Sequence, residues 1–443
     1  MQKSTNTKGE FVDILSIRDY NKCAGVDNLV RVKRPNALIY FLVFIFFFPI
    51  IKLLFRLEID RKGYNPPKGA FIIVSNHSSF ADFLIVMLSL YPVRVNAVTA
   101  QKFFLYKPLH KLLPLMGCIP KNLFDPDIRS IIGIKSVLKR GDKVLLFPEG
   151  RCACDGFWAG MHKSTGKLIK KLGVPVISCS VDGAYKCMPF WRDGLRAGRV
   201  RIIVADLFSP GDLQSLSIDE INDAVDKRLG RGDEPAPQKP FRTFGTRRLA
   251  EGLQYIIYWC PKCGSEFKTE TEGCIIRCTE CGNAAQIDRD MVLNPLQNSI
   301  VPGTVHAWYR VQARYEAERL SEDMEPVKVR VDVLLPSDVP GDGMSTRGCG
   351  VISLDPKGWR YEGELKGEQV SLFFPIDTVP ALPFDPNDVF QIYANGTFYM
   401  FSPENKRECV KYSVIGECAY WKFASVVQMT PRKDSGFCDT VQR

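Results

Sequence analysis

The sequence predicts three folded parts: an α/β domain, a small cysteine-rich module and a mostly β carboxyl-terminal domain. Apolar, strand-like runs alternate with helical patterns between residues 70 and 208, which is typical of a sheet with helices on its faces. Two Cys-x-x-Cys-Gly sequences follow at 260–264 and 278–282, and alternating β patterns dominate from residue 327 onward. A chain of 443 residues is long enough for two or three domains.

Charge is divided unequally along the chain. Residues 1–231 contain 35 Lys and Arg against 20 Asp and Glu, a net charge of +15, whereas residues 232–443 carry a net charge of −5. A basic amino-terminal half suits an anionic partner such as a phospholipid surface. Its cations are scattered between apolar segments and no nucleic-acid-binding motif is present, so we expect no nucleic acid partner. The 15 Cys and the absence of a signal peptide favour a reducing, cytoplasmic compartment.

A polar segment, residues 1–35, precedes a strongly apolar one. Residues 37–51 are fifteen uncharged residues flanked by cations. We predict a membrane anchor helix over residues 36–57, because a span needs about 20 residues and Lys52 can extend toward the headgroups. A spanning helix, a helix in the membrane plane and a buried soluble helix remain open. A second basic and apolar stretch, residues 102–116, fits either the same interface or an ordinary core helix.

The first candidate site follows a predicted strand at Phe71–Val74. A polar turn, Ser-Asn-His-Ser-Ser, leads into a helical pattern from Phe80 to Leu90. Asp82 falls in the first turn of that helix, where the macrodipole favours a carboxylate. It can reach a ring nitrogen of His77 and orient the ring as a general base. The alternative is a histidine that only donates a hydrogen bond at a strand end.

The second candidate site is the segment K-V-L-L-F-P-E-G-R at residues 143–151. It places Glu149, Gly150 and Arg151 at the carboxyl end of a strand, where α/β proteins place their sites. No Ser or Cys nucleophile is needed if the hydroxyl of the substrate itself attacks. Further elements complete a domain over residues 58–231, with a Pro-rich linker at 232–245. They are helices at 126–140, 162–172 and 218–230 and strands at 174–181 and 199–208.

These segments resemble the glycerolipid acyltransferase family, whose best-known member is 1-acyl-glycerol-3-phosphate acyltransferase. The resemblance covers roughly residues 60–230. It rests on N-H-x-x-x-x-D at residues 76–82, F-P-E-G at 147–150 and a Val-Pro strand followed by G-A-Y at 174–185. The sequence departs from the family after F-P-E-G, where Arg-Cys-Ala replaces Thr-Arg-Ser. It also departs in the second motif, where Lys121 is nearest to the family's Arg.

The resemblance implies a membrane-associated O-acyltransferase of phospholipid biosynthesis. It would move a fatty acyl group from acyl-CoA or acyl carrier protein to a lysophospholipid acceptor, 1-acyl-glycerol-3-phosphate, making phosphatidic acid. His77 would be the general base and Asp82 its orienting partner. Glu149, Gly150, Arg151 and Lys121 would bind the acceptor or shape the oxyanion site. The alternatives are an acyltransferase acting on glycerol-3-phosphate or another lysophospholipid, and a non-catalytic lipid-binding scaffold.

The cysteine-rich module spans residues 246–290 and begins with a predicted short helix at 246–258. Its two knuckles have the spacing of a four-cysteine zinc ribbon, with Cys260, Cys263, Cys278 and Cys281 as ligands. A chance pair or a redox dithiol is the alternative. Closed four-cysteine sites are structural, so we expect Zn²⁺ to stabilise a small fold.

Residues 300–430 form the predicted mostly β domain. Helices are expected at residues 304–323 and 409–423, with several strands between them. Strands followed by a carboxyl-terminal helix loosely resemble a pleckstrin-homology or GRAM-like domain. Such folds bind lipids or proteins, and the fold alone does not choose between these ligands.

Overall fold

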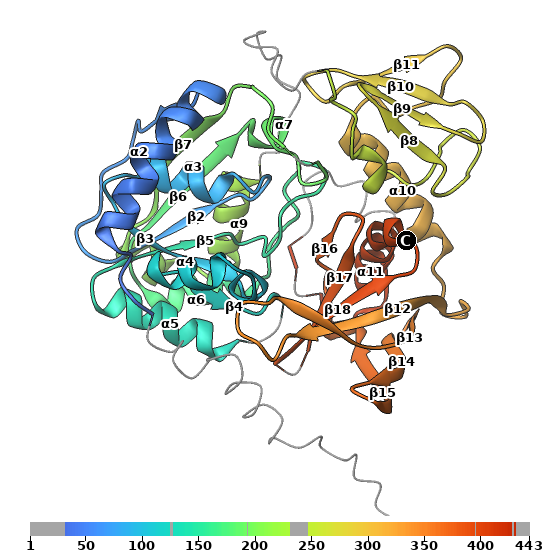
Figure 1. The fold of residues 1–443 in the computed structure, drawn as a ribbon. Coiled ribbons are helices and arrows are strands. Elements are labelled where there is room, and N and C mark those ends of the chain that lie inside the picture. The colour runs from blue at the N-terminus through green and yellow to red at the C-terminus, as the bar shows by residue number, and fades with distance from the viewer. Residues whose placement is uncertain are drawn as a thin grey trace, which may run out of the picture.

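The computed structural model describes residues 32–124, 127–192, 194–230, 247–394, 396–427 and 429–430. Most of the predicted polar segment and the whole predicted linker lie outside the described residues. Figure 1 shows the α/β part on one side, with the cysteine-rich module and the carboxyl-terminal sheet on the other.

A seven-stranded sheet forms the α/β part, in the order β1-β7-β6-β2-β5-β3-β4. All neighbouring strands are parallel except β6 and β7. Every residue of the central strand β2 is buried, as expected for a parallel strand covered on both faces. The strands are β1 (Glu58–Asp60), β2 (Phe71–Ser75), β3 (Val95–Ala100), β4 (Ile119–Lys121), β5 (Lys143–Leu146), β6 (Val176–Asp182) and β7 (Arg201–Phe208).

Helices cover both faces of this sheet, and alternate residues of β2 point into two different apolar clusters. Ile73 packs in the cluster that contains residues of α2 and α3, whereas Ile72 and Val74 pack with residues of α5, α6 and α9. The predicted α/β fold is therefore present. The helices are α2 (Ala37–Leu54), α3 (Asp82–Ser89), α4 (Leu109–Leu115), α5 (Ile128–Lys139), α6 (Ser164–Leu172), α7 (Ala184–Cys187), α8 (Pro210–Ser215) and α9 (Ile218–Leu229), with a 3-10 turn, η2, at Gln101–Leu105.

The apolar helix α2 lies along the α/β part and is fastened at both ends. Before the helix, the backbone N–H of Asn36 donates to the carbonyl of Leu115 at 3.0 Å; after it, the N–H of Val200 donates to the carbonyl of Phe55 at 2.8 Å. The hydroxyl of buried Tyr40 accepts from the N–H of Val95 at 3.0 Å. By length and composition α2 is the one helix among the described residues that could cross a membrane.

The cysteine-rich module is a four-stranded antiparallel sheet in the order β11-β10-β9-β8. The helix predicted at residues 246–258 is wrong for the described residues, which contain only the 3-10 turn η3 (Leu253–Tyr255). Gly252 has a φ of 92°, in the left-handed region, and its backbone packs closely on the carbonyl of Trp191. The consecutive residues 256–258 are fully buried. Such a segment has no exposed helical face. The strands are β8 (Thr269–Glu272), β9 (Ile275–Cys278), β10 (Ala284–Ile287) and β11 (Leu293–Leu296).

The carboxyl-terminal part is an antiparallel sheet of seven strands, in the order β15-β14-β13-β12-β18-β17-β16. The predicted mostly β character is confirmed. Helix α10 (Val305–Arg319) precedes the sheet, and the largely buried helix α11 (Cys409–Phe423) follows it and contacts α10. The strands are β12 (Val327–Pro336), β13 (Met344–Asp355), β14 (Gly358–Leu365), β15 (Glu368–Pro375), β16 (Phe384–Asp385), β17 (Val389–Ala394) and β18 (Thr397–Pro403), with 3-10 turns η4 (Ile376–Thr378) and η5 (Lys406–Glu408).

One apolar cluster joins the three parts. A single cluster runs from the carboxyl-terminal sheet through α10 and α11 to the cysteine-rich module, and it reaches Cys154, Tyr185 and Trp191 of the α/β part. The carboxyl-terminal half therefore packs against the edge of the α/β sheet that carries the candidate catalytic residues.

Candidate active site

The turn after β2 is fastened to the neighbouring strand β6. The side chain of Asn76 donates to the carbonyl of Val181 at 2.8 Å and accepts from its N–H at 2.8 Å. Asn76 thus takes the place of a backbone group at the point where β2 ends. This fixes the path of the chain from the strand into α3.

His77 and Asp82 form a close pair in this turn. Nδ1 of His77 lies 3.3 Å from Oδ2 of Asp82, and the same oxygen accepts from the backbone N–H of Ser79 at 2.7 Å. The Asp82 side chain is fully buried, whereas that of His77 is 20% exposed. With Nδ1 facing the carboxylate, Nε2 is the ring nitrogen that can take a proton from a reactant.

The environment of Asp82 combines burial with favourable partners. Burial raises the pKa of Asp82, while the hydrogen bonds to His77 and to the backbone of Ser79 and Ser78 oppose that rise. The ring of Phe147 stacks on His77 with centroids 4.5 Å apart. The pair is therefore shielded on one side by an aromatic ring from the F-P-E-G segment.

Glu149 contacts the backbone of His77 rather than its ring. One carboxylate oxygen accepts from the backbone N–H of His77 at 2.6 Å, and the other accepts from the N–H of Ala159 at 2.9 Å. Burial raises the pKa of Glu149 to about 8. The N–H of Ala153 donates to the carbonyl of His77 at 2.8 Å. The loop after β5 therefore holds the His77 backbone from both sides, and this geometry favours a positioning role for Glu149.

Gly150 allows the chain to turn immediately after Glu149. Its φ of 69° belongs to the left-handed region, and a Cβ there would contact the Phe124 ring at 3.4 Å. Glycine adopts this conformation without the strain that other residues would carry. The turn directs Arg151 toward the carboxyl-terminal part.

The two predicted phosphate contacts lie in different places. The guanidinium of Arg151 donates to Glu417 of α11 at 2.7 Å, with side chains 12% and 9% exposed. Lys121 is the last residue of β4, the edge strand, which is three strands away from β2. At the usual strand spacing, the backbones of β2 and β4 lie roughly 14 Å apart. Burial lowers the pKa of His162, and the charge of Lys121 adds to this effect. The structure thus brings Glu149 and Gly150 to the His77–Asp82 pair, and Lys121 ends the edge strand β4.

The thiol of Cys152, which follows Arg151, is poorly suited to act as a nucleophile. Desolvation raises the pKa of Cys152 well above its usual value, and the charges of Asp82 and Glu149 add to the rise. The thiolate is the reactive form of cysteine. The raised pKa therefore disfavours Cys152 as a nucleophile.

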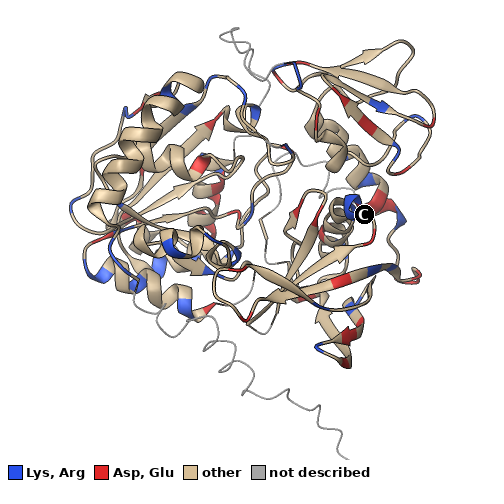
Figure 2. Cartoon of the chain, in the orientation of Figure 1, with Lys and Arg blue, Asp and Glu red and all other residues tan. Residues whose placement is uncertain are grey.

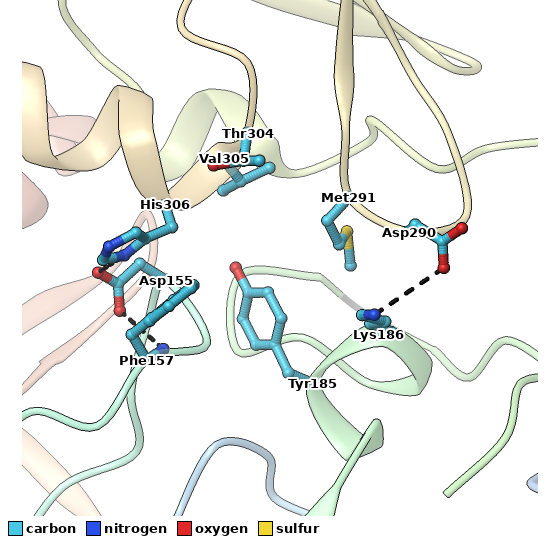
Figure 3. A pocket seen from close by; sticks show the side chains of 9 residues that line it. All are labelled: Asp155, Phe157, Tyr185, Lys186, Asp290, Met291, Thr304, Val305 and His306. Atoms are coloured by element: carbon cyan, nitrogen blue, oxygen red, sulfur yellow. Dashed lines mark hydrogen bonds and ion pairs between the residues drawn. The ribbon is translucent and has the colours of Figure 1, made fainter. Parts of the chain in front are cut away.

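A second His–Asp pair, which the sequence analysis missed, lies at the junction of the parts (Figure 3). Nδ1 of His306 is 3.0 Å from Asp155, and its ring stacks on Phe157 with centroids 3.5 Å apart. The adjoining cavity of about 20 Å³, also lined by Tyr185 and Lys186, is large enough for about one water molecule. This pair ties α10 to the loop after β5 and has no room for a substrate.

The four predicted ligand cysteines are brought together in the cysteine-rich module. Their sulfurs all lie within 4.8 Å of one another. Cys260 and Cys281 are 3.7 Å apart, and Cys263 and Cys278 are 3.8 Å apart. A tetrahedron with metal–sulfur bonds of about 2.3 Å has edges of about 3.8 Å. The four thiols therefore fit a tetrahedral metal ion.

Comparison with known proteins connects this site to a family. Residues 56–182 match the model of the Acyltransferase family, and this segment contains His77, Asp82 and Glu149. The resemblance to glycerolipid acyltransferases is confirmed over this segment.

Curated relatives match the same region. The chain is 30% identical over 136 residues to a chloroplastic 1-acyl-sn-glycerol-3-phosphate acyltransferase of Brassica napus, covering 30% of this chain and 39% of the relative. It is 28% identical over 189 residues to an enzyme of that name from Chlamydomonas reinhardtii, covering 41% of this chain and 56% of the relative. The chain thus spans about two fifths to just over half of the length of these relatives.

Among solved structures, the 1-acyl-sn-glycerophosphate acyltransferase PlsC from Thermotoga maritima is 20% identical, with a TM-score of 0.38. The match covers 46% of this chain and 82% of that protein.

Proposed function

We propose, from the acyltransferase family membership of residues 56–182, that the chain is a membrane-associated O-acyltransferase. It transfers a fatty acyl group from acyl-CoA or acyl carrier protein to 1-acyl-glycerol-3-phosphate and makes phosphatidic acid. The observation that carries the proposal is the buried Asp82 carboxylate 3.3 Å from Nδ1 of His77, within the segment that matches the family.

In the proposed mechanism His77 acts directly on the acceptor. Nε2 takes the proton of the acceptor hydroxyl as its oxygen attacks the thioester carbonyl. A C–O bond forms, the C–S bond breaks, and the imidazolium returns the proton to the leaving sulfur. Asp82 stays ionised and stabilises the imidazolium, while Glu149 fixes the backbone of His77 through the hydrogen bond at 2.6 Å.

The acceptor's phosphate is proposed to contact cationic side chains at or after the carboxyl ends of β5 and β4. Arg151 follows the turn at Gly150, directly after Glu149, whose carboxylate contacts the His77 backbone. Lys121, at the carboxyl end of β4, is the second candidate contact. The planar guanidinium can bind a phosphate through two hydrogen bonds, whereas the ammonium acts as a point charge.

Helix α2 is proposed to lie in the plane of the membrane. Its outer face exposes large apolar side chains, while its two ends and Tyr40 are held by the α/β part. A spanning helix would have to leave these contacts. Figure 2 shows Lys and Arg on the helices of the α/β part, which suits anionic lipid. The exposed side chains include Leu38, Phe41, Leu42, Ile45, Phe46, Phe47, Ile50 and Leu53.

The active site is proposed to face the cytoplasm, because the described cysteines are free thiols and a reducing compartment maintains them.

The tetrahedral cysteine site is proposed to hold a structural Zn²⁺ through Cys260, Cys263, Cys278 and Cys281. When bound, the ion would cross-link the two knuckles. The carboxyl-terminal sheet and α11 are proposed to form a pleckstrin-homology or GRAM-like domain.

The test is an acyl-transfer assay of the purified chain with both donor classes and a panel of acceptors. We expect thiol release and phosphatidic acid with 1-acyl-glycerol-3-phosphate. A preference for glycerol-3-phosphate or another lysophospholipid would select the alternative enzyme. Lipid binding without transfer to any acceptor would contradict the catalytic proposal and favour a lipid-binding scaffold.

A further inference from the structure

The Arg151–Glu417 ion pair joins the candidate acceptor site to the carboxyl-terminal helix. Its N–O distance is 2.7 Å, and the two side chains are 12% and 9% exposed. A shielded pair of this kind is costly to break, because removing one partner leaves a buried charge uncompensated. An anion that binds this nitrogen of Arg151 must therefore displace Glu417.

Glu417 is held in place by a broad contact between the two halves of the chain. Lys102 Nζ lies 2.6 and 2.9 Å from the Asp385 carboxylate, and the rings of Phe190 and Phe384 meet edge to face at 5.3 Å. The Thr430 hydroxyl accepts from the N–H of Met161 at 2.8 Å. These contacts position α11 at the sheet edge independently of the ion pair.

The surroundings of Arg151 are rich in carboxylates. Arg151 pairs with Glu417, and the same loop carries Glu149, which contacts the His77 backbone. A phosphate that entered without displacing Glu417 would meet its carboxylate as a like charge. Exchange with Glu417 avoids this, because Arg151 remains paired throughout.

We propose that Glu417 occupies the acceptor's phosphate position on Arg151 and so makes acceptor binding selective for phosphomonoesters. This inference rests on the proposed function of the site. A phosphomonoester carries about −1.5 to −2 charges near neutral pH and offers three acceptor oxygens, so it can compete with one carboxylate for a guanidinium. A neutral acceptor cannot, and it meets Arg151 already paired with Glu417.

The competition has a measurable consequence for affinity. When a side chain of the protein occupies a binding site, the apparent dissociation constant of a ligand equals the intrinsic constant divided by the fraction of molecules whose site is open. Removing the charge of Glu417 should therefore strengthen binding of the phosphomonoester. We expect a KM about 10- to 100-fold lower, the range that one hydrogen bond to a charged group accounts for.

The experiment compares the full chain with Glu417→Gln, Glu417→Asp and the control Asp385→Asn, which removes the charge from another ion pair between the same two halves. KM is measured for 1-acyl-glycerol-3-phosphate and for uncharged monoacylglycerol. Calorimetry with glycerol-3-phosphate and inorganic phosphate supplies a readout that needs no catalysis, and the two ligands separate a glycerol-linked phosphate from a free anion. Thermal melting monitors folding.

The proposal predicts that Glu417→Gln lowers the phosphomonoester KM and dissociation constant, while monoacylglycerol and the Asp385→Asn control change little. In an Arg151→Gln background the effect of Glu417→Gln should disappear. Unchanged or weaker binding of the phosphomonoester by Glu417→Gln would overturn the proposal. An equal fall in KM for monoacylglycerol would also overturn it, because it would show that Glu417 only blocks the site sterically. If Glu417→Gln unfolds, Glu417→Asp must show the same direction of change. Tighter phosphate binding without acyl transfer in any variant would refute the enzyme and leave the exchange on Arg151 standing.

Discussion

Replacing Glu149 with Gln tests how His77 is held. In the wild type the two carboxylate oxygens accept from the N–H groups of His77 and Ala159, at 2.6 and 2.9 Å. Gln has only one acceptor oxygen, so one buried backbone donor loses its partner. A buried backbone donor left without a partner costs about 1–3 kcal/mol. We expect the free energy of unfolding, measured in urea, to fall by about this amount.

The same substitution should lower kcat more than it raises KM for the acceptor. A shift of about 1 Å in a reacting group can cost roughly 100-fold in rate, and Glu149 contacts the backbone that carries the base. Glu408→Gln is the matched control, because Glu408 accepts from Tyr412 within the carboxyl-terminal part. Unchanged stability with a raised KM and constant kcat would refute this reasoning and return Glu149 to acceptor binding.

Four further outcomes are expected. Asp82→Asn should lower the single-turnover transfer rate by about 10²–10⁴-fold, because the ring loses its orienting carboxylate; a loss below about tenfold would contradict this. Phe46→Asp on the exposed face of α2 should reduce cosedimentation with anionic vesicles without changing Tm, and unchanged pelleting would move the anchor elsewhere. Cys278→Ser should eliminate stoichiometric zinc in metal analysis, whereas a wild type without zinc would refute the metal assignment. Because burial raises the pKa of Glu149 to about 8, the unfolded chain releases this proton first as pH rises. The contribution of Glu149 to the free energy of unfolding should therefore fall between about pH 4.5 and 8, by at most about 1.4 kcal/mol per pH unit. Glu149→Gln should flatten this pH dependence in urea titrations.

Much of the α/β part could be predicted because its signals are local. The apolar run at residues 71–74 is buried on both sheet faces, as a continuous apolar strand should be. His77 and Asp82 meet because only a short turn and the start of one helix separate them. The predicted contact between the two side chains therefore required no knowledge of the rest of the fold.

The orientation of Glu149 could not be predicted from the sequence. Its motif indicated a site at a strand end, but whether the carboxylate faces the substrate or the His77 backbone depends on how β5 packs beside β2. The helix expected at residues 246–258 failed for a related reason. Packing against Trp191 and burial of consecutive side chains override the helical pattern there.

The contact between Arg151 and Glu417 joins residues 266 positions apart. Neither residue has a local pattern that indicates the other, since the ion pair depends on how the carboxyl-terminal sheet docks. The same holds for His306 and Asp155, whose pairing depends on the placement of α10. Tertiary packing thus determines which cations at this site already have partners.

The most direct test of the central claim is acyl transfer by His77→Ala in the full chain, measured as phosphatidic acid formed from palmitoyl-CoA or an acyl carrier protein and 1-acyl-glycerol-3-phosphate. Loss of the general base should reduce the rate by about 10²–10⁴-fold, with Tm and vesicle binding unchanged. Retention of more than roughly a tenth of the wild-type rate would show that His77 is not the base.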